Sequence, residues 1–233
     1  INEDASCGAV LVPHYYWFPE ALDLKQRLVM YLPDYMPHFF HKTGEFKSDE
    51  GHHTEIGRLL VAKSEEIFCN SRFTKSYLPS SRLQVPDSKI KVFYLPLLNS
   101  ATSPAAISPE DEIIVGLPES YIFYPTQPRA NKNLSFLIRV FDRLADENAE
   151  LGLCLTSRLG PDPKALAAYQ CMRHPDRVFF RERVSDEQLR SLYGNAALLC
   201  FTSMAEGNFP PQIHEAVTYG VPVVAARHSF ITE

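Results

Sequence analysis

The sequence predicts an α/β protein of two domains, the second of which is a doubly wound parallel sheet. Two observations lead to this prediction. Short apolar runs of strand length alternate with stretches of helical periodicity, most strictly after residue 112. Residues 99–112 are small, polar and proline-bearing, as interdomain linkers are. We therefore expect a first domain over residues 1–100, a linker over 101–112 and a second domain over 113–233.

The first domain alternates less regularly. Its apolar runs predict strands at residues 9–12, 28–32, 65–69 and 90–95. Helical patterns cover residues 57–64 and 74–78, and Ser71 stands where it would cap the second of these helices. The two histidines that follow Gly51 predict a polar loop.

Two segments of the first domain, residues 12–19 and 31–40, combine aromatic residues with proline and are predicted to be loops. They contain His14 and His38. Large aromatic side chains in loops suit the binding of sugars or lipids, although folding of the loop over the core explains any single one somewhat better.

The second domain alternates cleanly between the two kinds of element. Its apolar runs predict strands at residues 121–124, 151–155, 177–180, 197–201 and 221–226. Helical patterns cover residues 133–145, 163–172, 185–193 and 210–219. Ser185 and Gln188 form a capping-box pattern at the start of the third helix. This alternation predicts a parallel sheet with helices on both faces.

Composition narrows the classes of function. The net charge of −5 comes without a long basic block, which argues against a nucleic acid partner. No apolar run approaches the roughly 18 residues of a membrane span, and the first residues do not resemble a signal peptide. The 5 cysteines are scattered without a C-x-x-C pair, as in reduced cytosolic proteins. We expect a cytoplasmic protein, and peripheral association with the inner face of a membrane stays open.

The stretch that organises the second domain is 206–220, E-G-N-F-P-P-Q-I-H-E-A-V-T-Y-G. It joins two predicted strands through a loop and a helix that Pro210 and Pro211 open and Gly220 ends. In a parallel sheet this loop lies at the carboxyl ends of the strands, beside a helix N-terminus that attracts phosphate. Two carboxylates, Glu206 in the loop and Glu215 in the helix, bracket the place.

This stretch resembles the paired-glutamate motif of retaining glycosyltransferases of the GT-B fold, the group 1 or family 4 enzymes that include mannosyltransferases. E-G, F-P-P, E-A-V-T-Y-G and V-P-V-V-A all have counterparts there. The run from V-S-D-E-Q to C-F-T-S and the segments 67–75 and 87–96 are similar to the same family. The resemblance implies two Rossmann-like domains with a cleft between them. Because relatives extend further at both ends, we expect both domains of this chain to be incomplete.

The resemblance also implies roles for the two glutamates. Glu206 would contact the hydroxyls of the donor sugar, and Glu215 would accept hydrogen bonds from the ribose of the nucleotide. Eight residues, 207–214, separate them, whereas the family usually has seven. The alternative is that neither residue binds a ligand, so that Glu206 is a solvated carboxylate of the loop and Glu215 lies on the surface of the helix.

The loop at residues 125–133, P-T-Q-P-R-A-N-K-N, carries the candidate cations. The family places an arginine and a lysine here, both on the donor's phosphates. Lys132 matches the lysine, while the arginine position falls on Gln127 and Arg129 lies two residues later. The alternative is a pair of surface cations, but the helix dipole disfavours cations at this end, which favours a bound anion.

The mechanism that the resemblance implies follows from charge. Cations and backbone N–H groups would stabilise the leaving diphosphate, and a carboxylate would favour positive charge on the sugar. Such enzymes retain the anomeric configuration and need no metal, and the histidines show no metal-binding spacing. The residues assigned to the leaving group are Lys132, Arg129, Gly207, Asn208 and Phe209, and Val184 belongs to the segment that would contact the base.

Many relatives have a histidine at the end of a first-domain strand that faces the donor. Aligning Asp34 with the family's aspartate puts Pro33 in that place. The histidine is therefore absent, displaced to His38, or replaced by His14.

The leading interpretation is a hexosyltransferase that uses GDP-mannose, the first choice, or a UDP-sugar. Its acceptor would be a saccharide or a lipid-linked saccharide in polysaccharide or lipopolysaccharide assembly. The alternative is a non-catalytic or regulatory nucleotide-sugar-binding protein of the same fold, which the missing histidine and the longer glutamate spacing suggest. A third interpretation is a nucleotide-sugar epimerase of similar fold, but such epimerases have histidine and glutamate patterns that differ from those of this chain.

Overall fold

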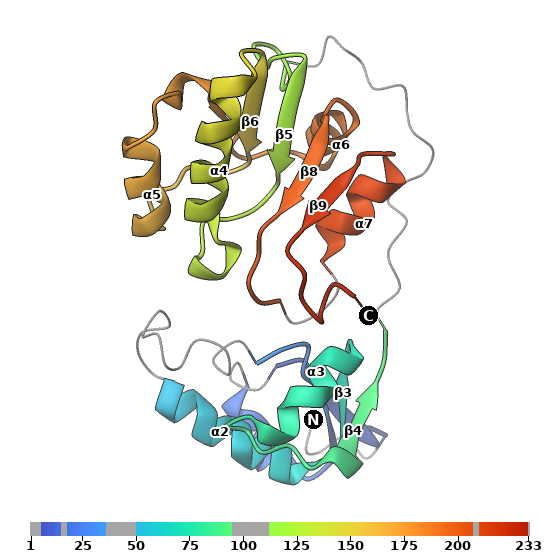
Figure 1. Ribbon diagram of the computed structural model, residues 1–233. Coiled ribbons are helices and arrows are strands. Elements are labelled where there is room, and N and C mark those ends of the chain that lie inside the picture. Colours follow the sequence, from blue (N-terminus) through green and yellow to red (C-terminus); the bar gives the residue numbers. More distant parts are fainter. Residues whose placement is uncertain (1–5, 15–17, 36–49, 95–111, 207–209, 233) are drawn as a thin grey trace. The chain divides into compact units, whose positions relative to one another are not determined.

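The computed structural model describes residues 6–14, 18–35, 50–94, 112–206 and 210–232 (Figure 1). The chain divides into two compact units. The first contains the described residues up to 94 together with 205, 206 and 228–232, and the second contains 112–204 and 210–227. The linker predicted at 101–112 lies outside the described residues except for Glu112.

The first unit is built on a four-stranded parallel sheet in the order β1-β2-β3-β4. Its strands are β1 (Ala9–Val12), β2 (Arg27–Tyr31), β3 (Ser64–Cys69) and β4 (Ile90–Val92). Its helices are α2 (Glu50–Lys63), α3 (Arg72–Tyr77) and the short 3₁₀ turns η1 (Pro19–Asp23), η2 (Leu78–Ser80) and η3 (Asp87–Lys89). All four strands were predicted to within a few residues.

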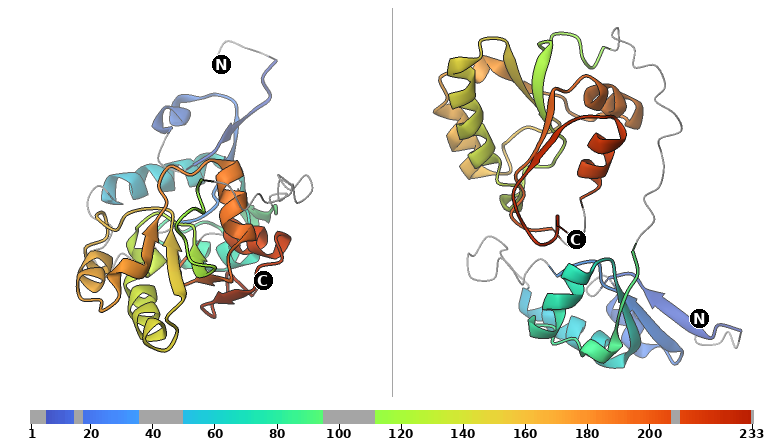
Figure 2. Two further views of the ribbon diagram at one scale, coloured as in Figure 1. Left: turned by 90° about the horizontal axis from the view of Figure 1, so that it is seen from above. Right: turned by 45° about the vertical axis from the view of Figure 1, so that its right-hand side comes forward.

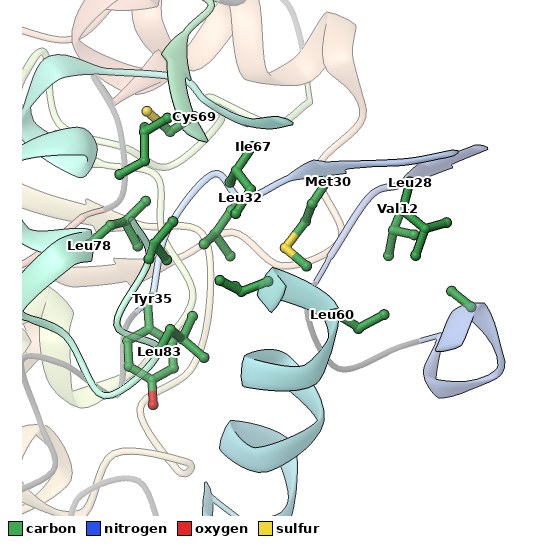
Figure 3. Close-up of a cluster of buried hydrophobic side chains, with 14 of the residues drawn as sticks. Val12, Leu28, Met30, Leu32, Tyr35, Leu60, Ile67, Cys69, Leu78 and Leu83 are labelled. Carbon is green, nitrogen blue, oxygen red and sulfur yellow. The ribbon is translucent and has the colours of Figure 1, made fainter. Parts of the chain in front are cut away.

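The core of the first unit forms where α2 packs against β2 and β3. Leu28 and Met30 of β2, Ile67 of β3 and Leu60 of α2 are buried there (Figure 3). Ser71 caps α3 as predicted, since its Oγ accepts a hydrogen bond from the Thr74 N–H at 3.0 Å.

The polar loop predicted around Gly51 is wrong, because residues 50–56 belong to α2. His52 and His53 are therefore helical. Glycine weakens a helix most in its interior, and Gly51 stands in the first turn, where the cost is smaller.

The second unit has five parallel strands in the order β7-β6-β5-β8-β9. They are β5 (Ser120–Tyr124), β6 (Leu151–Leu155), β7 (Val178–Phe180), β8 (Leu198–Phe201) and β9 (Val223–Ala225). The α-helices are α4 (Leu134–Glu147), α5 (Pro163–Gln170), α6 (Asp186–Gly194) and α7 (Pro211–Thr218), and 3₁₀ turns lie at η4 (Ala130–Lys132) and η5 (Pro175–Arg177).

The strand order of the second unit reverses at β5. From β5 the chain moves outward through β6 to β7, and then returns to the other side of β5 for β8 and β9. Since parallel crossovers are right-handed, a change of direction also changes the face that the helices cover. Figures 1 and 2 show this, with α4 and α5 on one face and α6 and α7 on the other. The predicted doubly wound sheet is confirmed.

Local signals set the helix boundaries of the second unit. The capping box at Ser185 is present, with Ser185 Oγ accepting from the Gln188 N–H at 3.2 Å. Gly220 follows α7 with φ of +71°, a conformation that glycine adopts without strain. The buried stripe of α4 has helical spacing and consists of Leu134, Leu137, Ile138, Phe141 and Ala145.

Candidate functional site

A cavity of about 710 Å³ opens in the second unit at the carboxyl ends of β5, β6 and β7 and beside the start of α7. Open parallel sheets bind ligands at this edge, where the strand order reverses. The volume lies within the roughly 300–1,000 Å³ of small-molecule sites. The lining residues are Pro125, Thr126, Gln127, Arg129, Lys132, Thr156, Ser157, Glu182, Arg183, Val184, Leu189, Pro211, Gln212 and Glu215.

The loop that carries Lys132 is fixed by the segment that follows β8. Thr202 Oγ1 donates to the Lys132 carbonyl at 2.8 Å, and Ser203 Oγ donates to the Asn131 carbonyl at 3.0 Å. The Met204 N–H donates to the same Asn131 carbonyl at 2.7 Å. Ser203 and Asn131 are buried, so these bonds are shielded from water and hold the backbone of Lys132 at the cavity.

Two further contacts join neighbouring loops of the cavity. The Thr126 N–H, after β5, donates to Thr156 Oγ1, after β6, at 2.9 Å. Arg158 Nε donates to Glu182 Oε2, after β7, at 2.8 Å. The loops at this edge of the sheet are thus hydrogen-bonded to one another.

Arg183 lines the cavity with φ of +55°, a left-handed conformation that a residue with a long side chain rarely adopts. Its neighbours are anchored on both sides. Arg181 donates to the carbonyls of Ile113 and Val115 at 2.7 and 2.9 Å, and the Ser185 N–H donates to Gln188 Oε1 at 3.0 Å. Strained backbone that is over-determined in this way concentrates at ligand sites.

The charges of the cavity favour an anion. Arg129, Lys132 and Arg183 bring three cations, against the carboxylates of Glu182 and Glu215. Glu182 already has Arg158 as a partner. Arg129 is oriented by Gln127, whose Oε1 accepts from Arg129 Nη2 at 3.1 Å.

The start of α7 contributes fewer N–H groups than an ordinary helix start. Pro211 at the first helical position has no N–H, and the Ile213 N–H donates to the Pro210 carbonyl at 3.1 Å. An anion bound here would therefore depend more on the cationic side chains than on the N–H groups of the helix start.

Glu215, on the second turn of α7, is held from behind by α6. Tyr193 Oη donates to Glu215 Oε2 at 2.6 Å. Burial and, after it, this hydrogen bond raise the pKa of the Tyr193 hydroxyl far above its usual range. The Tyr193 hydroxyl therefore keeps its proton at neutral pH.

Neither a metal cluster nor a membrane span is found among the residues described. In the described ranges no group of three or more His, Cys, Asp and Glu side chains is placed to hold a metal ion. None of the helices in those ranges has the length and apolar character to cross a bilayer.

Residues 119–233, which include every residue of the cavity wall, match the sequence model of the family described as glycosyl transferases group 1. This part of the chain belongs to the group 1 glycosyltransferases. It is 30% identical over 145 residues to the MMP α-(1→4)-mannosyltransferase of Mycolicibacterium hassiacum, a match that covers 55% of this chain and 34% of that enzyme.

Solved structures show the fold of the chain. HepE of Anabaena, crystallised in complex with UDP, matches with a TM-score of 0.71 at 18% identity, over 97% of this chain and 62% of HepE. Sucrose-phosphate synthase of Thermosynechococcus elongatus matches with a TM-score of 0.65 at 14% identity, over 94% of this chain and 56% of that one. The fold is GT-B, and the chain spans less than two thirds of the length of these relatives.

Five of the predicted site residues line one cavity. They are Gln127, Arg129, Lys132, Val184 and Glu215. They come from three separate parts of the second unit, the loops after β5 and β7 and the helix α7. Their roles toward a donor stay predictions.

The remaining predicted site residues do not line this cavity or lie outside the described residues. Glu206 is half-buried and belongs to the first unit, as does the half-buried His14. Gly207, Asn208, Phe209 and His38 lie outside the described residues. Burial lowers the pKa of His14 to about 4, so this ring is neutral at physiological pH.

Sequence reasoning missed several residues of the cavity wall. Thr156 and Ser157 directly follow β6 and were not predicted, while Glu182 and Arg183, which follow β7 after one residue, lie in the segment 181–184 predicted near the base but were not named as site residues. Their position after predicted strands was the available signal, because the carboxyl ends of parallel strands share one edge. Tyr193 gave no such signal, since its spacing is that of a core residue in α6.

Proposed function

We propose that this protein is a retaining glycosyltransferase that moves a hexose from a nucleoside diphosphate sugar to a saccharide or lipid-linked acceptor. The observation that carries the proposal is the convergence of Lys132, Arg129 and Glu215 on one cavity in the domain that matches the family. A cationic cavity with a carboxylate at one side suits a ligand with a diphosphate and neighbouring hydroxyls.

The chemistry of the wall orients the donor. Lys132 and Arg129 lie after β5 and would hold the two phosphates, with Arg183 as a further cation. Glu215 would accept hydrogen bonds from the ribose hydroxyls. The base would lie against the loop after β7, where Val184 lines the cavity.

The reaction breaks the bond between the anomeric carbon and the β-phosphate oxygen. The electron pair leaves with the nucleoside diphosphate, whose added charge Lys132 and Arg129 stabilise. Positive charge that develops on the sugar is favoured by a carboxylate, the role we assign to Glu206. The acceptor oxygen attacks from the same face and gives its proton to the departing phosphate oxygen. In this proposal the cations replace a divalent metal.

We infer mannose as the sugar and GDP-mannose as the first donor to test. The support is the 30% identical relative, which is named as a mannosyltransferase. UDP-sugars are the second donors to test, since HepE structures contain UDP and UDP-glucose. With an acceptor of this class, we infer a role in polysaccharide or lipopolysaccharide assembly, in the cytoplasm or at the inner face of a membrane.

The test uses the whole chain with GDP, UDP, ADP and their hexose conjugates. Binding is followed by the melting temperature, which ligand binding raises by mass action, and turnover by the release of nucleoside diphosphate. We expect GDP-mannose to raise the melting temperature most and to be hydrolysed or transferred. Binding without turnover favours the non-catalytic alternative, and no binding of any of these nucleotides contradicts both.

A further inference from the structure

The contact between α6 and α7 joins a buried tyrosine to the one carboxylate of α7 that reaches the cavity. Tyr193 is 1% exposed and lies in the last turn of α6. Its hydroxyl donates to Glu215 Oε2 at 2.6 Å and lies 3.4 Å from the Gln212 carbonyl oxygen. A distance of 2.6 Å is typical of an O–H group that donates to an ionised carboxylate.

The tyrosine ring itself is held on two sides. It stacks on Tyr219, at the end of α7, with ring centroids 5.7 Å apart, and it meets Phe123 of β5 edge to face at 5.1 Å. The preceding residue is anchored as well, because Tyr121 Oη donates to the Leu192 carbonyl at 2.6 Å. The hydroxyl of Tyr193 therefore has a fixed position relative to β5.

Glu215 lines the cavity and Tyr193 does not. Tyr193 thus contacts the Glu215 carboxylate from the side away from the cavity. One of the two carboxylate oxygens, Oε2, accepts the hydrogen bond from Tyr193. A glutamate side chain has three rotatable bonds, and ordering a side chain of this kind costs about 0.5–1.5 kcal/mol when a ligand binds. A hydrogen bond that fixes the carboxylate beforehand removes part of this cost from binding.

We propose that Tyr193 is a positioning residue, which holds Glu215 so that its other oxygen accepts hydrogen bonds from the ribose hydroxyls of the nucleotide. This inference rests on the proposed function and names a residue behind the binding surface. Tyr193 would itself touch no substrate, and its effect would reach the ligand through Glu215.

The test compares the wild-type chain with Tyr193→Phe, using UDP, GDP and their 2′,3′-dideoxy forms, by isothermal titration calorimetry. We expect Tyr193→Phe to bind the preferred ribonucleotide about 5- to 10-fold more weakly. The dideoxy form, which has no ribose hydroxyls for Glu215 to bind, should have the same affinity for both proteins.

Tyr35→Phe is the matched control, since it removes a hydroxyl from another fully buried tyrosine, whose Oη lies 2.8 Å from Thr54 Oγ1 in the first unit. It should lower the melting temperature as Tyr193→Phe does and leave the discrimination between ribose and dideoxyribose unchanged. A second route uses Glu215→Gln, which reduces that discrimination. In this background Tyr193→Phe should change the ribonucleotide affinity less than 2-fold.

The outcomes separate the two proposals. An equal loss for ribonucleotide and dideoxynucleotide, or no loss for either, would overturn the role of Tyr193 while the proposed function stands. The same loss from Tyr193→Phe with and without Glu215→Gln would overturn it also. If the wild-type chain binds neither UDP nor GDP, the proposed function falls and this inference with it.

Discussion

The two units are built from the same parts but arrange their strands differently. In the first, the four strands lie in chain order, β1-β2-β3-β4. In the second, the order reverses at β5, so that the neighbouring strands β5 and β8 lead to α4 and α7 on opposite faces. Loops that leave toward opposite faces open a crevice between them. Strand order, more than the identity of the strands, therefore decides where a cavity forms.

Polar groups near the carboxyl ends of the two sheets differ in what they contact: those of the first unit bond to one another, and those of the second unit reach the cavity. In the first unit, the Tyr35 N–H donates to Tyr77 Oη at 2.9 Å, and Tyr35 Oη is 2.8 Å from Thr54 Oγ1. Tyr35 and Thr54 are buried, and these bonds stabilise the unit from within. In the second unit, Lys132 and Arg129 reach the cavity while their backbone is held by the loops. This contrast predicts that substitutions at the buried Tyr35 contacts change stability, whereas substitutions at the cavity change binding.

The largest expected effect is on binding, from Lys132→Ala. A hydrogen bond between an ammonium group and phosphate contributes about 1.5–3 kcal/mol, so the affinity for a nucleoside diphosphate should fall about 10- to 150-fold. Affinity for the nucleoside alone should stay the same. The measurement is calorimetric titration, with Lys164→Ala, an exposed lysine of α5 away from the cavity, as the matched control. An equal loss in both variants would contradict the role of Lys132.

The second effect is on stability, from Tyr35→Phe. This change leaves Thr54 Oγ1 buried without the tyrosine hydroxyl, which costs about 1–3 kcal/mol in the free energy of unfolding of the first unit. Urea unfolding followed by the fluorescence of Trp17, the single tryptophan of the chain, measures it. Nucleotide affinity should be unchanged. A loss of nucleotide affinity as large as the loss of stability would contradict the prediction that this contact acts on stability alone.

A smaller effect on binding should follow Ser203→Ala. The substitution removes the bond from Ser203 Oγ to the Asn131 carbonyl and so loosens the backbone next to Lys132. We expect affinity for a nucleoside diphosphate to fall about 5-fold, the equivalent of about 1 kcal/mol. Ser76→Ala, which removes a hydroxyl bond to the Phe73 carbonyl in the first unit, is the control and should leave titrations unaltered.

The smallest effect concerns the pH dependence of the first unit. The pKa of His14 is lowered from 6.5 to about 4 by burial, so between these values the unfolded chain binds a proton that the folded chain does not. Its contribution to stability is complete above pH 6.5 and is lost as the pH falls toward 4. Because the ring is partly exposed, we expect about 1 kcal/mol. His14→Gln should flatten the change in unfolding free energy between pH 7 and pH 4.5, and an unaltered slope would contradict this.

The sequence by itself determined the secondary structure of the second unit and most of the first. Ser71, Ser185 and Gly220 act through hydrogen bonds or backbone angles within a few residues, so their effects can be read from local spacing. Around Gly51 the local signal misled, because the position of a glycine within a helix decides its cost.

Tertiary structure alone decided which side chains share the cavity. The sequence named Lys132 and Glu215 through a motif, but their convergence depends on the reversal of strand order at β5. The cation Arg183 depends on a backbone conformation that its residue type does not predict. Tyr193 has the spacing of an ordinary core residue, and its bond to Glu215 spans 22 positions of the chain. Contacts between residues far apart in sequence are fixed by packing, which local patterns do not contain.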